Sequence, residues 1–224
     1  MRNVRRADPS VVDAFAQYGV ATIHEAQGRM GLLASYMSPV YRGPHVAGSA
    51  VTVRVPPADN WMIHVAVEQC REGDVMVVAP PAPSDAGYFG ELLATALQAR
   101  GVRGVVIDAG CRDAAELREM EFPAWAKCIG AFGTVKETLG DVNLGVVCAG
   151  EWVQPGDVIV GDDDGVVVVA RERADEVLAA CAAREEKEAA SRRRYRAGEL
   201  SLDVQGMRER LAEKGLRYVE QGDD

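Results

Sequence analysis

Apolar residues recur along the chain at two different spacings, which predict two kinds of regular element. In residues 8–30 they fall on one helical stripe that Gly19 divides in two, and Asp8-Pro9-Ser10 is typical of a helix start. Short apolar runs punctuated by glycine predict buried strands instead. We expect strands at 40–41, 48–55, 73–79, 102–107, 125–129, 142–147 and 158–169, the last a hairpin turning at 162–165, and helices at 60–68, 90–100 and 113–120.

The order of these elements, with strands and helices mixed along the chain, predicts a layered α/β or α+β domain. The pattern changes in residues 171–196, which predict one long charged helix with a thin apolar stripe. Such a helix is either a solvated end or an arm on a neighbouring subunit, because so polar a surface gains little from its own core. We therefore divide the chain into a core, residues 1–170, and a C-terminal helical arm, residues 171–224.

The composition is that of a soluble globular protein, with 48% hydrophobic and 26% charged residues. The 34 acidic and 25 basic residues give a net charge of −9, which argues against general nucleic-acid binding because that needs a cationic face. No apolar run approaches the roughly 18 residues of a membrane span, and we expect no secretory signal. The 5 cysteines are scattered, which fits reduced thiols better than disulfides or zinc. We expect a cytoplasmic protein without nucleic-acid or membrane partners.

A glycine-bearing loop at 87–90 precedes the predicted helix 90–100. The amides in the first turn of a helix have no partners within that helix. Here they belong to residues near Leu92 and Leu93, and they would attract a small carboxylate or phosphate. The loop lacks the further glycine of a dinucleotide fingerprint and the Lys-Ser/Thr of a P-loop, so neither nucleotide motif is present.

Three charged residues border this predicted helix and the strand after it. Glu91 lies in the first helical turn, while Arg112 and Asp113 follow the carboxyl end of strand 102–107, where open α/β sheets place ligands. Arginine suits a planar carboxylate or an enolate oxygen, and paired carboxylates suit Mg²⁺ or Mn²⁺. Spacing alone favours an ordinary surface turn, with Asp113 as a helix N-cap and a solvated Arg112.

An acidic residue followed by twenty others and then Arg-Asp resembles the signature of metal-dependent pyruvate aldolases of the RraA-like family. Here the motif is Glu91, residues 92–111, and Arg112-Asp113. These aldolases cleave 4-hydroxy-4-methyl-2-oxoglutarate and 4-carboxy-4-hydroxy-2-oxoadipate, and the wider family includes regulators of RNase E. The similarity extends over nearly the whole chain, from about 21 to 219. Its further segments are 122–127, 133–140, 141–144, 147–150, 155–165 and 198–203.

The resemblance implies a fold, an assembly and a metal. The fold is a layered α/β/β/α sandwich similar to swivelling β/β/α folds, in a single domain with an extended C-terminal helix. The assembly is a homotrimer or homohexamer with sites at subunit boundaries. The metal is a divalent ion, Mg²⁺ or Mn²⁺, bound directly by Asp113. Glu91 and Glu188 would hold it through water, Glu188 coming from a neighbouring subunit with Glu186 as the alternative.

The resemblance also implies a 2-oxo acid substrate and its chemistry. The groups that would bind the pyruvate part are Arg112 and the main chain of Gly90, Leu92 and Leu93. Cleavage leaves pyruvate enolate, whose charge the metal and Arg112 would stabilise. Arg112, Glu91 and Glu188 are therefore the expected catalytic residues. The same site would decarboxylate oxaloacetate, and the enzyme would serve bacterial protocatechuate or gallate breakdown.

A non-enzymatic regulator that binds a ribonuclease E-type partner is the alternative function within the same family. A protein that only binds another protein has no physical reason to keep Glu91 together with Arg112 and Asp113. The complete motif therefore favours the aldolase.

Overall fold

The computed structural model describes residues 4–219. Residues 1–3 and 220–224, the ends of the predicted core and arm, lie outside the described residues. The chain divides after Cys181 into two compact units, a core unit and a C-terminal unit. Within 4–219, no helix has both the length and the apolar content needed to cross a bilayer.

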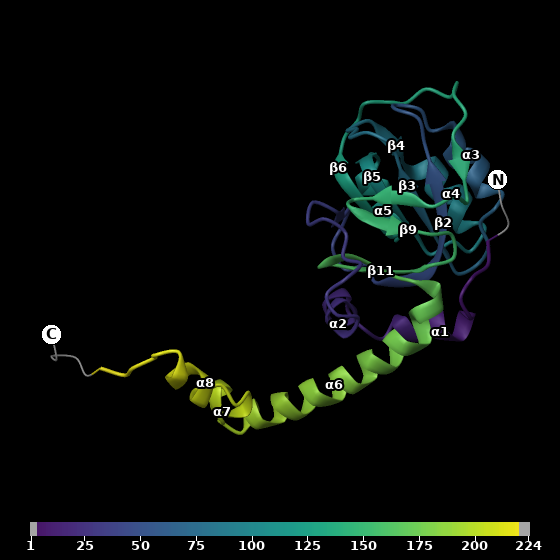
Figure 1. The fold of residues 1–224 in the computed structure, drawn as a ribbon. Coiled ribbons are helices and arrows are strands. Elements are labelled where there is room, and N and C mark those ends of the chain that lie inside the picture. Colours follow the sequence, from purple (N-terminus) through teal and green to yellow (C-terminus); the bar gives the residue numbers. More distant parts are fainter. Residues whose placement is uncertain (1–3, 220–224) are drawn as a thin grey trace. The chain divides into compact units, whose positions relative to one another are not determined.

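The core unit alternates strands and helices as the apolar pattern predicts (Figure 1). Its strands are β1 (Ser38–Pro39), β2 (Val46–Arg54), β3 (Asp74–Ala79), β4 (Gly87–Phe89), β5 (Gly104–Cys111), β6 (Ala124–Ile129), β7 (Asp141–Val142), β8 (Val146–Cys148), β9 (Glu151–Val153), β10 (Val158–Asp162) and β11 (Gly165–Val169). Its helices are α1 (Pro9–Phe15), α2 (Val20–Ala26), α3 (Trp61–Val67), α4 (Glu91–Gln98), α5 (Ala114–Glu119) and a 3₁₀ turn (Arg171–Arg173). Helix α6 (Ala174–Arg196) begins in the core unit, and the C-terminal unit adds α7 (Ser201–Val204) and α8 (Arg208–Glu213).

One nine-stranded sheet forms the centre of the core unit, in the order β1-β6-β5-β3-β2-β10-β11 with β4 beside β5 and β7 beside β2. The neighbours β2, β3, β5 and β6 are parallel, and β10 joins β2 antiparallel. The sheet curls so that Trp125 of β6 reaches β10, where its indole Nε1 donates to the carbonyl of Asp162 at 2.8 Å. The two predicted β layers are therefore opposite walls of one nearly closed sheet.

Helices cover this sheet on two sides, which confirms the mixed α/β class. Helices α3, α4 and α5 pack on β2, β3 and β5 through a buried apolar cluster. Helix α2 packs instead on β10 and β11, and α1 packs on β2, within a second apolar cluster. A third apolar cluster fills the interior of the curl around Trp125, and the β8–β9 hairpin adds Val146 and Val153 to it.

Two predicted strands differ from the structure. The expected strand 142–147 is interrupted, because Asn143 adopts a left-handed backbone (φ +60°) and separates β7 from β8. Its amide instead donates to the carbonyl of Thr52 at 2.8 Å. The strand expected at 40–41 lies two residues earlier, as β1. The division at Gly19 is confirmed, since this residue is the N-cap of α2.

We expect Gly161→Ala to destabilise the core unit by about 1–3 kcal/mol through overpacking. A Cβ at this position would lie 2.7 Å from the Trp125 ring, which is fully buried. Urea denaturation would measure the change in the free energy of unfolding. In a double-mutant cycle with Trp125→Phe, the smaller ring should relieve part of the cost; strictly additive effects would contradict this account.

Candidate active site

Strand β4 places the start of α4 beside the end of β5. Gly87 pairs with Gly110 of β5, and a Cβ on Gly87 would lie 2.5 Å from the carbonyl oxygen of Gly130, so only glycine fits. Two residues later the carbonyl of Phe89 accepts the amide of Arg112 at 2.9 Å. The last residues of β5 are thereby held against the first turn of α4.

Asp113 adopts a left-handed backbone (φ +55°) immediately before α5. Its side chain does not cap α5. Instead, Oδ2 accepts the amide of Glu91 at 3.0 Å, at the beginning of α4. A Cβ on Gly90 would lie 2.2 Å from the same oxygen, so the carboxylate occupies the space that a side chain would fill. The view of Asp113 as an ordinary cap of its own helix is therefore wrong.

The two amides after Glu91 have no acceptor in the described chain. The first backbone hydrogen bond of α4 runs from the amide of Ala94 to the carbonyl of Gly90 at 3.1 Å. Within residues 4–219 no acceptor is recorded for the amides of Leu92 and Leu93. Unpaired amides at a helix N-terminus favour an anion through both hydrogen bonding and the helix dipole.

Arg112 places a cation at the same end of α4. Its Nε lies 3.7 Å from Oδ2 of Asp113, and its side chain is 47% exposed. The Arg112 side chain is therefore accessible to a ligand. The neighbouring Cys111 is fully buried, and burial raises the pKa of its thiol to about 12. At neutral pH the thiol stays protonated, which argues against a nucleophilic role for Cys111.

The oxygen atoms here fit a water-rich magnesium or manganese site. No hydrogen bond among the described residues reaches Oδ1 of Asp113, so this atom is available as a ligand. Glu91 accepts the hydroxyl of Thr95 at 2.9 Å through Oε1, which holds its carboxylate on the first turn of α4. No group of three or more His, Cys, Asp or Glu in residues 4–219 could hold a metal. One protein carboxylate plus several waters suits Mg²⁺, which sheds its water reluctantly.

A network that the sequence did not indicate holds β4 in place. The Nδ2 of Asn60 donates to the carbonyl of Tyr88 at 2.9 Å, and the Tyr88 hydroxyl donates to the carbonyl of Pro56 at 3.2 Å. Next to them, burial raises the pKa of Asp59, but bonds from three backbone amides and the charge of Lys136 outweigh it and leave the pKa lowered. The carboxylate therefore stays ionised, anchoring loop 136–138 to α3 well below neutral pH.

Glu188 lies in α6, in the C-terminal unit. It pairs with Arg184 at 2.9 Å and with Arg192 at 3.6 Å along the same helix, while Glu186 is exposed. The structure thus brings together Gly90, Glu91 and Asp113 with their neighbours in sequence. The part that Glu188 plays in the site stays a prediction.

Comparison with known proteins places this arrangement in a family. The model of the RraA-like family, described as Aldolase/RraA, matches residues 9–168, which include the whole of the site in the core unit. The chain belongs to the RraA-like family. A Halalkalibacterium halodurans member named "Putative 4-hydroxy-4-methyl-2-oxoglutarate aldolase" is 26% identical over 157 residues, covering 70% of this chain and 75% of the relative. A Burkholderia multivorans member with the same name is 32% identical over 151 residues, covering 66% and 92%.

The family also contains members described as regulators. A Streptomyces coelicolor structure, described as an unusual member of the RNase ES inhibitor RraA protein family, matches with a TM-score of 0.73 and 28% identity. It covers 84% of this chain and 100% of its own. Similarity in fold therefore does not by itself separate the enzyme from the regulator.

Proposed function

We propose that this chain is a divalent-metal-dependent aldolase that releases pyruvate from a 4-hydroxy-2-oxo acid carrying two or three carboxylates. The candidate substrates are 4-hydroxy-4-methyl-2-oxoglutarate, which yields two pyruvates, and 4-carboxy-4-hydroxy-2-oxoadipate, which yields pyruvate and oxaloacetate. The names of the aldolase relatives support this class of substrate. Decarboxylation of oxaloacetate as a side activity and a place in aromatic-acid breakdown belong to the same proposal.

The observation that carries the proposal is that groups favouring an anion and a carboxylate able to bind a cation lie together at the first turn of α4. Two unpaired amides and Arg112 favour an anion, while Asp113 beside them presents an open carboxylate oxygen. A 2-oxo acid has both a carboxylate for the amides and a ketone oxygen for cationic groups. A binding surface for another protein would not need this combination within one turn.

Each of these residues has a separate role in carbon–carbon cleavage. The amides of Leu92 and Leu93 bind the pyruvate carboxylate and orient the ketone. Arg112 stabilises the negative charge that develops on the ketone oxygen as the enolate forms. Glu91, together with Glu188 from a neighbouring subunit, holds water that accepts the proton of the C4 hydroxyl. Asp113 would hold the divalent ion, which supplies Lewis-acid stabilisation of the same charge when bound.

Pyruvate release with and without metal tests the function. With Mg²⁺ or Mn²⁺ and either substrate, we expect pyruvate that a coupled lactate dehydrogenase detects as loss of NADH. Chelation followed by gel filtration should lower the rate at least about tenfold, since Lewis-acid stabilisation is worth several kcal/mol, and added Mg²⁺ should restore it. Full turnover by the stripped protein would refute the metal dependence.

Mixed assemblies test whether Glu188 acts in a neighbouring subunit. We expect Glu188→Gln and Asp113→Asn each to be poorly active alone. Glu188→Gln should lower the rate of pyruvate release by about tenfold or more, because proton transfer is impaired. Co-expression of the two variants should recover activity, because some sites then combine an intact Asp113 with an intact Glu188. Glu186→Gln removes the alternative glutamate, two residues away on α6, and should keep full activity; loss of activity there would assign the role to Glu186. If mixing gives no recovery, Glu188 does not act across subunits.

A regulator of an RNase E-type enzyme is the second candidate, favoured by the likeness to the Streptomyces coelicolor protein. It predicts inhibition of RNA cleavage when the purified chain is added to such a ribonuclease. That inhibition should survive Arg112→Ala, whereas pyruvate release should not. The two functions are therefore separable in one set of proteins.

A further inference from the structure

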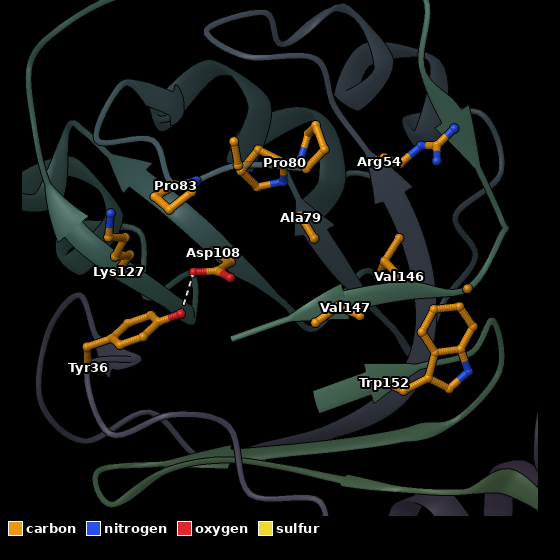
Figure 2. Close-up of a pocket in the computed structure, with 13 residues that line it drawn as sticks. Tyr36, Arg54, Ala79, Pro80, Pro83, Asp108, Lys127, Val146, Val147 and Trp152 are labelled. Atoms are coloured by element: carbon orange, nitrogen blue, oxygen red, sulfur yellow. Dashed lines mark hydrogen bonds between the residues drawn. The ribbon is translucent and has the colours of Figure 1, made fainter. Parts of the chain in front are cut away.

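A cavity of about 630 Å³ opens at the carboxyl ends of β2 and β3 and beside Asp108 of β5 (Figure 2). Arg54 and Ala79, the last residues of β2 and β3, line it together with Asp108 of β5. The carboxyl ends of parallel strands are where open α/β sheets bind ligands. Neither Arg112 nor Asp113 is among the lining residues.

The segment 80–86 borders this cavity and passes over β5 near the residues that lead into the candidate active site. The segment crosses β5 at Gly110. A Cβ on Gly110 would lie 2.4 Å from the carbonyl oxygen of Asp85 and 2.6 Å from that of Ala86. Pro80 and Pro83 of the same segment line the cavity. Proline restricts the backbone, so this wall is stiff.

A flat apolar surface forms the opposite wall. The ring of Trp152 lies directly on Gly145, where a Cβ would be 2.1 Å from the indole. Its partner across the β8–β9 hairpin is Val147, and both side chains are more than half exposed, at 57% and 58%. An exposed indole held in one orientation is a stacking surface for a flat, unsaturated group.

Two cations lie on different sides of the cavity, Lys127 near Tyr36 and Arg54 near Val146 (Figure 2). Lys127 pairs with Asp85 at 2.7 Å, and Arg54 pairs with Asp141. One partner of each pair is well exposed, Asp85 at 77% and Arg54 at 59%, while Lys127 and Asp141 are 27% and 29% exposed. Water at the exposed partner weakens both ion pairs. Each cation also keeps unused donors, so a carboxylate ligand can compete for it.

The one carboxylate among the lining residues already accepts two hydrogen bonds. Asp108 accepts the hydroxyl of Tyr36 at 2.9 Å and the amide of Ala149 at 2.8 Å. Burial, together with the bond to Asp108, raises the pKa of Tyr36 to about 12, so the hydroxyl remains a donor at neutral pH. The charged lining residues are therefore two cations and one occupied carboxylate.

We propose that this cavity is a second binding site, for a small organic acid that carries a carboxylate on a flat unsaturated body, such as an aromatic acid. The flat body stacks on Trp152 and the prolines, and the carboxylate binds Lys127 or Arg54. The site is independent of the aldolase reaction, and its occupancy is measurable without any substrate.

Titration with benzoate and benzene-1,4-dicarboxylate tests the proposal on the full chain. We expect saturable heat in calorimetry and a change in tryptophan emission that Trp152→Phe removes. Lys127→Met or Arg54→Met should weaken the binding of at least one of the two acids by about tenfold, the effect of losing one charge-assisted hydrogen bond. Neutral benzamide and non-planar cyclohexanecarboxylate should bind at least about tenfold more weakly than benzoate.

Matched variants separate this site from others. Arg29→Met removes an exposed cation outside the cavity and should bind like the wild type. Arg112→Met should also bind normally; loss of binding there would place the acid in the candidate active site and overturn the proposal. So would equal binding by benzamide, or no saturable binding up to about 10 mM. If the emission of Trp152 changes on dilution of the protein and not on addition of acid, a second copy of the chain covers this wall. That result would also overturn the proposal.

Discussion

Replacing Asp113 with asparagine is expected to lower pyruvate release about 10³-fold or more, since both metal affinity and charge stabilisation are lost. The fold should survive. The side-chain oxygen of the new asparagine can still accept a hydrogen bond from the backbone amide of Glu91, which Oδ2 of Asp113 accepts at 3.0 Å. The measurements are kcat/KM in the coupled pyruvate assay, a Mg²⁺ titration of the rate, and a thermal melt of both proteins.

The control for this substitution is Asp164→Asn, which removes a carboxylate of the same size from the exposed β10–β11 turn. It should leave kcat/KM unchanged. An Asp113→Asn protein with wild-type turnover would remove the basis of the proposed metal site.

Gly90→Ala should cost on the order of 10²-fold in kcat, because catalytic groups displaced by about an ångström lose that much. The backbone of Gly90 is extended (φ −165°), so alanine adopts it without strain. The new Cβ would instead lie 2.2 Å from Oδ2 of Asp113 and 3.0 Å from Cγ of Arg112, and both side chains must move. Steady-state kinetics and the Mg²⁺ titration would report the displacement.

Gly133→Ala is the matched control for that variant. A Cβ at Gly133 would meet Arg112 Nη1 at 4.0 Å, an ordinary contact distance. We expect activity within about twofold of wild type, since nothing has to move. Equal losses in both alanine variants would mean that crowding at Gly90 is not the cause.

The elements of the core were largely predictable because apolar spacing reports burial directly. The strands at 73–79 and 125–129 and the hairpin of 158–169 are confirmed within a few residues. Their pairing was not predictable, since it depends on contacts distant in sequence. Nothing local to Trp125 indicates that its ring lies against Gly161, and this contact shows how far the sheet curls.

The candidate site was predictable in its residues but not in its geometry. Spacing only allowed Glu91 and Asp113 to lie near one another, because the strand runs back along the helix that precedes it. The resemblance to the aldolases is what singled these residues out. It could not show that Asp113 turns away from its own helix, which depends on a left-handed backbone at φ +55°. It also gave no sign of Asn60 and Tyr88, whose polar groups bond to the main chain and form no motif.

The bond between Asp113 and the beginning of α4 has a consequence for how the protein would acquire the proposed ion. Because this contact forms within the chain, the apoprotein is expected to be fully folded with its site already shaped, unlike small zinc domains that are unfolded when empty. Loading and exchange would then be reversible events on a finished molecule. With the proposed metal dependence, a cell short of magnesium or manganese would keep folded, inactive protein that regains activity when the ion returns.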